Sequence, residues 1–130
     1  MAKLNQEQLL EIFDALKKVM KPYEKGVIRP QIDIQGRYDQ WANKKVFAAN
    51  KWRDEFAFTG LILQSGYVGF YYMPIYTNTE EVRPLISAEL LKSLKGKSCF
   101  HIKKVDKDVL EQVAEAMRIG YDQYEKNGWL

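Results

Sequence analysis

A long aromatic segment in the middle of the chain constrains the fold more than any other feature. Residues 67–76 contain four tyrosines, and they follow the apolar run 56–64 after only Ser65 and Gly66. Glycine tolerates the positive φ of a tight turn, so the two runs predict a β-hairpin. Alternation along the second strand gives two apolar or aromatic faces, which is typical of a strand in the middle of a sheet. One face would carry Val68, Phe70 and Tyr72, and the other Tyr67, Gly69, Tyr71 and Met73.

The remaining pattern predicts an α+β domain. Asn5, Ser87 and Asp106 are N-cap residues that start helices, and the first helix ends before Pro22. We expect half-buried strands at 28–35, 45–50 and 97–103, a loop at 77–84 and a last helix to about residue 126. Pro30 suggests a sheet edge. The order predicts a two-layer sandwich: an antiparallel sheet of about five strands with the N- and C-terminal helices packed on one face.

Composition limits the class of protein. The chain has 130 residues, of which 46% are hydrophobic, so we expect a single domain over 1–130. One cysteine excludes an internal disulfide and suits the cytoplasm. The polar N-terminus lacks a signal-peptide pattern, and no apolar run approaches the roughly 20 residues of a membrane span. We therefore expect a cytoplasmic protein with no membrane partner.

One local cluster of lysines interrupts an otherwise mixed surface. The net charge is only +3, and lysines on a strand and its turns often serve to prevent pairing with another chain. We therefore do not expect nucleic acid as a partner. The cluster comprises Lys92, Lys95, Lys97, Lys103, Lys104 and Lys107.

Carboxylates on the first helix form a candidate metal site. Glu7, Glu11 and Asp14 are spaced by four and three residues and so share one helix face, and iron accepts oxygen ligands. The competing interpretation is an ordinary solvated face. A similar acidic stripe on the last helix is interleaved with basic residues, which favours the solvated interpretation there.

The rare side chains form a second candidate site, for a ligand. Cys99 and His101 lie two apart on one strand face, but two ligands are too few for a structural metal site, which takes four. If the Tyr71 face of the sheet is open, Tyr71 would be its centre, with His101 and Arg37 as polar anchors. The competing interpretation is a buried core. The chain has one His and no catalytic motif, so we do not expect an enzyme.

Three segments resemble the YdhG-like family of small bacterial domains of unknown function. They are GFYYMPIY at 69–76, LKGKSCFHIKKVD at 94–106 and Ile119-Gly120. The resemblance implies a frataxin-like α+β fold and a non-enzymatic cytoplasmic binding domain. One member is described as an iron chaperone, so the resemblance suggests weak iron binding or delivery, with iron as the only cofactor in view. The alternative is a module that binds a non-metal small ligand or a protein through an aromatic sheet face.

Overall fold

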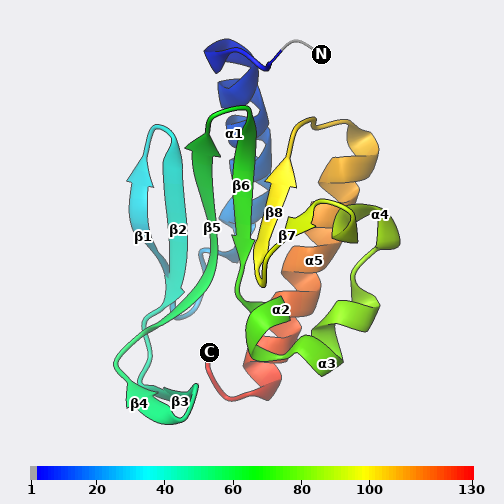
Figure 1. Cartoon of the computed structure of the whole chain (residues 1–130). Coiled ribbons are helices and arrows are strands. Elements are labelled where there is room, and N and C mark those ends of the chain that lie inside the picture. The colour runs from blue at the N-terminus through cyan, green and yellow to red at the C-terminus, as the bar shows by residue number, and fades with distance from the viewer. Residues whose placement is uncertain (1–2) are drawn as a thin grey trace.

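A six-stranded antiparallel sheet organises the computed structural model, which describes residues 3–130 (Figure 1). Its strand order is β1-β2-β5-β6-β8-β7, and each neighbouring pair is antiparallel. The strands are β1 (Ile28–Ile34), β2 (Arg37–Ala42), β5 (Phe56–Gln64), β6 (Tyr67–Tyr72), β8 (Cys99–Ile102) and β7 (Leu94–Lys95). The α+β prediction is confirmed, with one strand more than expected.

Two strands of the sheet were not predicted, β2 and the short β7, whose residues were expected in the helix that begins at Ser87. The prediction placed no strand between residues 35 and 45, but Gly36 adopts a φ of 84° and turns the chain back beside β1. Tyr38, Gln40 and Ala42 then alternate into the core. The short strand expected at 45–50 is present as β3 (Val46–Ala48), but its expected place in the main sheet is wrong, because it pairs with β4 (Lys51–Arg53) in a separate hairpin.

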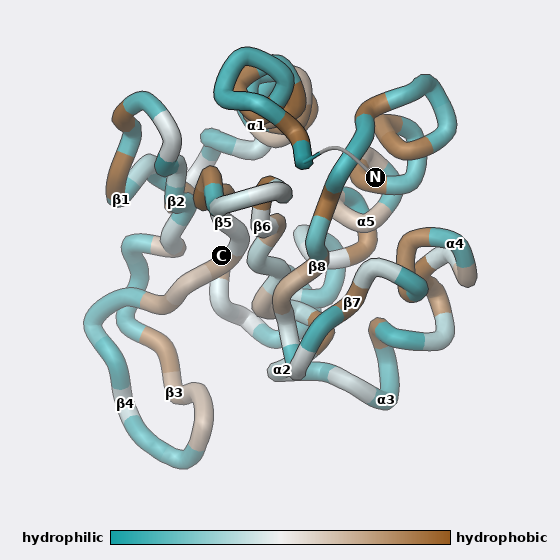
Figure 2. Tube along the Cα trace, turned by 45° about the horizontal axis from the view of Figure 1, so that its top comes forward, coloured by the Kyte–Doolittle hydropathy of each residue, from teal (hydrophilic) through white to brown (hydrophobic). Residues whose placement is uncertain are grey.

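The two long helices lie on the same side of the sheet, as predicted (Figures 1 and 2). Helix α1 (Gln6–Met20) begins with the expected capping box of Asn5 and Gln8, and the short 3-10 turn η1 (Lys21–Tyr23) holds Pro22. Helix α5 (Lys107–Lys126) begins at the Asp106 cap. Two buried tyrosine hydroxyls attach α5 to the sheet: Tyr72 donates to the Ala116 carbonyl at 2.5 Å, and Tyr124 donates to the Ala57 carbonyl at 2.7 Å.

Helical turns connect β6 to β7 where a longer strand and a loop were predicted. Strand β6 ends at Tyr72, because Pro74 cannot donate a ladder hydrogen bond and suits the start of a helix. The segment comprises α2 (Pro74–Thr77), α3 (Thr79–Val82), η2 (Arg83–Leu85) and α4 (Ala88–Leu91). Ile75, Val82, Ile86 and Leu90 are buried, so these short turns are held by packing.

The closest approach of helix to sheet is at Gly120. A Cβ at this position would lie 2.7 Å from Pro74 Cγ and 2.9 Å from the Tyr72 hydroxyl. Residue 120 must therefore be small for α5 to reach its position on β6. Among residues 3–130, no helix is both long enough and apolar enough to cross a membrane.

Candidate functional site

Strand register divides the central strands into a core face and a second face. Phe70, Tyr72, Phe100 and Ile102 are buried beneath α1 and α5, as the alternation predicted. On the other parity of the same strands Tyr67, Tyr71, Cys99 and His101 are partly exposed, while Gly69 is buried. This face is turned toward the reader in Figure 1, with both long helices behind it. We define the open sheet face by Arg37, Asp39, Ile62, Tyr67, Tyr71, Lys95, Cys99, His101 and Lys103.

All four residues of the predicted ligand site belong to this open sheet face. One cross-strand row runs Arg37, Ile62, Gly69 and His101, and the next row runs Asp39, Gly60, Tyr71, Cys99 and Lys95. Directly paired residues present their side chains on the same face. Tyr71 and Cys99 are therefore neighbours. Arg37 is three strand spacings from His101, about 14 Å, so the two share a face without touching.

The Tyr67 and His101 rings form a parallel stack on the open sheet face, near the hairpin end of β6. Their centroids are 3.8 Å apart and their planes differ by 10°. Gly69 is paired directly with His101, and a Cβ there would come within 3.1 Å of the Tyr71 ring and 3.3 Å of Cys99 Sγ. The Tyr71 ring therefore lies close to the backbone at Gly69, beside the stack.

The pKa shifts of His101, Cys99 and Tyr71 all favour the neutral form of the side chain. Burial lowers the pKa of His101, and the nearby charges of Lys95 and Lys103 lower it further. Burial raises the pKa of the Cys99 thiol, and burial with the adjacent Cys99 raises the pKa of Tyr71. A reactive cysteine has a lowered pKa, and the shift at Cys99 is in the opposite direction.

Positive charge at one edge of the open sheet face lacks a counter-ion. In the part of the chain that the structure describes, Lys95 and Lys103 form no ion pair. The other lysines of the cluster differ: Lys92 pairs with Glu89 at 3.0 Å, Lys104 with Asp106 at 3.3 Å and Lys107 with Glu111 at 3.9 Å, while Lys97 lies over the Tyr76 ring.

Arg37 at the opposite side of the face is compensated. Its guanidinium donates to the Asp39 carboxylate at 3.0 Å. That carboxylate lies above Gly60, where a Cβ would be 2.7 Å from Asp39 Oδ1. The net positive charge of the open sheet face is therefore concentrated around His101.

The predicted metal carboxylates lie elsewhere. Glu7, Glu11 and Asp14 are exposed on the side of α1 that points away from the sheet, so they do not join the open sheet face. Among residues 3–130, no three His, Cys, Asp or Glu side chains are grouped closely enough to hold a metal ion.

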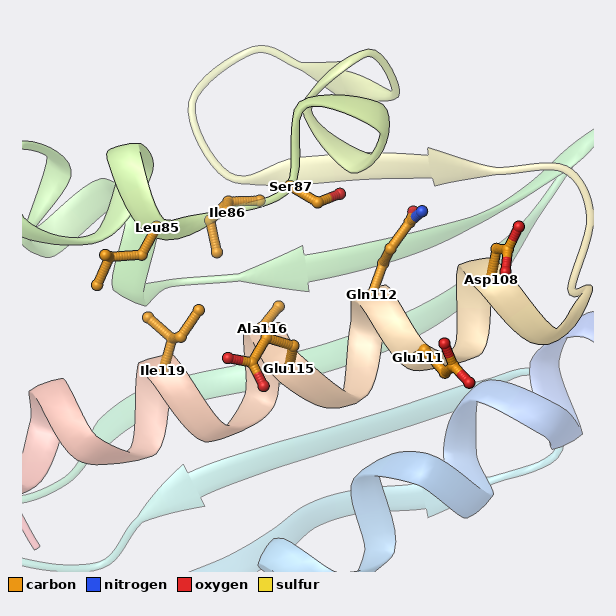
Figure 3. A pocket seen from close by; sticks show the side chains of 9 residues that line it. All are labelled: Leu85, Ile86, Ser87, Asp108, Glu111, Gln112, Glu115, Ala116 and Ile119. Carbon is orange, nitrogen blue, oxygen red and sulfur yellow. The ribbon is translucent and has the colours of Figure 1, made fainter.

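A groove along α5 was not predicted. Its two hollows, of about 270 and 410 Å³, share Asp108 and Gln112 and lie between α5 and the segment 85–93. Figure 3 shows the smaller one. The larger hollow extends to His101 at the sheet edge. The acidic side chains of the groove come from the stripe on the last helix, from Glu89 of α4 and from the cap residue Asp106. Four of them form ion pairs, namely Glu89, Asp106, Glu111 and Glu115.

Two features of the site escaped the sequence prediction for different reasons. Tyr67 shares the parity of Tyr71, so alternation alone could have added it. Lys95 could not have been found, because β7 is a two-residue strand placed beside β8 by tertiary packing. Comparisons of the chain with protein-family models, curated proteins and solved structures find no match.

Proposed function

We propose that this protein is a non-catalytic binding module that holds its partner on the open sheet face. The observation that carries the proposal is the Tyr67–His101 stack, which stands beside Tyr71 on a surface that neither long helix covers. Half-exposed aromatic rings on a rigid sheet provide contact area at little cost in conformational entropy, and such rings are enriched at binding surfaces.

The shape of this surface favours an extended partner over a small molecule enclosed in a pocket. Small-molecule sites are concave and enclose most of their ligand. The hollows described above lie along α5 and at the margin of the face, and the strands around Tyr71 present a sheet surface. A partner laid across several strands would use the aromatic rings together.

Iron handling, the function suggested by the YdhG-like resemblance, would use a different surface. Its candidate ligands Glu7, Glu11 and Asp14 project from the outer side of α1. The two functions can therefore be separated by mapping where a ligand contacts the protein.

The test is a nuclear magnetic resonance titration of ¹⁵N-labelled protein with a library of flat aromatic fragments, and separately with ferrous iron. We expect fragment-induced shifts to cluster on residues 67–71 and 99–103, and to be lost in Tyr67→Ala. Tyr76→Ala is the matched control, because Tyr76 is exposed outside the face. Shifts confined to the groove along α5 would overturn the proposal, and iron-induced changes confined to 7–14 would favour iron handling instead.

A further inference from the structure

We infer that the partner of the open sheet face is a single-stranded nucleic acid, whose bases stack on the aromatic rings and whose phosphates meet Lys95 and Lys103. This inference rests on the proposed function and specifies its partner.

The stack on the face has the geometry of base stacking. Tyr67 and His101 are nearly parallel at 3.8 Å, and both side chains are only half-buried. A flat group arriving from solvent can extend such a stack. Base–aromatic stacking contributes about 1–3 kcal/mol per base and tolerates any sequence, because every base has a π-face. Tyr71, in the neighbouring row, offers a further ring.

The charges beside the stack select an anionic partner. Lys95 and Lys103 flank His101 closely enough to lower its pKa, and no carboxylate within residues 3–130 pairs with either lysine. The three lysines of the cluster that are neutralised by carboxylates belong to α4, α5 or the loop between β8 and α5. The sequence cluster therefore divides into paired lysines and a cationic edge of the aromatic face.

Each nucleotide of a nucleic acid strand carries one base, which can stack on the aromatic rings, and one phosphate, which can meet a lysine. A second copy of this chain offers less, because Asp39, the one carboxylate among the residues that define the open sheet face, already pairs with Arg37. A duplex fits less well, since its bases are already stacked and only unpaired bases are free to meet aromatic rings. We therefore expect the open sheet face to bind a single strand.

The experiment uses fluorescein-labelled oligothymidine and oligouridine of about 12 nucleotides, a length within the range that single-strand-binding sheets cover. Binding is followed by fluorescence anisotropy at several salt concentrations, with a duplex of equal length for comparison. We expect the single strands to bind more tightly than the duplex.

The variants separate stacking from charge. Tyr67→Ala should weaken binding about tenfold, the loss of one stacked base, while Tyr67→Phe, which keeps the ring, should restore most of it. The double change of Lys95 and Lys103 to Gln should reduce the slope of log affinity against log salt by about 1.4. The matched double change of Lys92 and Lys107 to Gln should leave that slope nearly unchanged.

Several outcomes would overturn the inference. They are no binding of either single strand at low salt, equal binding of duplex with no effect of Tyr67→Ala, and tighter binding of a poly-glutamate peptide. A dimer in sedimentation that Tyr67→Ala dissociates would show that a second copy covers the face. If the oligonucleotides fail while aromatic fragments still map to 67–71 and 99–103, the proposed function stands and only the nucleic acid partner falls.

Discussion

Replacing Gly120 by alanine should destabilise the protein, although helix propensity alone predicts the opposite. Alanine is favoured over glycine inside a helix by about 1 kcal/mol. At Gly120 the new methyl group would lie 2.7 Å from Pro74 Cγ and 2.9 Å from both the Tyr72 hydroxyl and Cε1. Overpacking a filled core costs roughly 1–3 kcal/mol. Since the residue is buried between helix and sheet, a cost near the middle of that range, about 2 kcal/mol, less the propensity gain of about 1 kcal/mol leaves an expected net loss of about 1 kcal/mol.

The assay is equilibrium unfolding in urea, with Ala114→Gly as the matched control. Ala114 is exposed on the same helix, so its change to glycine should cost about 1 kcal/mol through propensity alone. A Gly120→Ala protein as stable as the native chain, or more stable, would refute the packing argument.

A double-mutant cycle with Tyr72→Phe tests the cause. Alone, this change removes the hydrogen bond to the Ala116 carbonyl and should cost about 1 kcal/mol. In the Gly120→Ala background it also removes an oxygen that clashes with the methyl group. Tyr72→Phe should therefore lower the free energy of unfolding less in the Gly120→Ala protein than in the native chain, with a coupling energy of at least about 0.5 kcal/mol.

Three further predictions concern single positions. Ala49 has a φ of 51° in the exposed β3–β4 turn, so Ala49→Gly should raise the free energy of unfolding by about 1 kcal/mol, measured in urea. The hydrogen bond from Lys17 lowers the pKa of the Asp33 carboxyl below 3.8. The ion pair of Lys17 and Asp33 therefore adds to the free energy of unfolding above that pH, and this stabilisation is lost as the pH falls through the lowered pKa. Asp33→Asn should thus cost less than about 1 kcal/mol at pH 7, and this difference should shrink as the pH falls below 3.8; an undiminished difference in acid would contradict the ion pair. Lys103→Gln should raise the pKa of His101, read directly by NMR because the chain has one histidine, and an unchanged pKa would show that Lys103 does not act on the ring.

The helices could be predicted because their signals are local. Asn5, Ser87 and Asp106 each accept a hydrogen bond from the backbone three residues ahead, which is the reason these residue types mark a helix start. Strand β2 was missed because it begins one residue after the turn at Gly36. The turns between 74 and 85 were missed because packing of Ile75 and Val82 into the core, rather than a long amphipathic pattern, holds them in place.

For the candidate site, the alternation of residues along each strand predicted only which side chains share a face of the sheet. Alternation correctly separated Phe70 from Tyr71 and Phe100 from His101. It could not reveal the Tyr67–His101 stack, which depends on the register between β6 and β8. Nor could it distinguish Lys103 from Lys104, since only the folded chain shows that Asp106 neutralises the latter.

The two outer strands of the sheet also bear on aggregation. Strand β1 carries Pro30, which donates no backbone hydrogen bond, and its register shifts between Pro30 and Ile32. At the other margin, β7 contributes only two residues before Gly96 turns the chain. A foreign strand would find few aligned donors and acceptors on either side, so templated β-assembly is disfavoured. This protein can therefore expose an aromatic surface while its edges resist growth into fibrils.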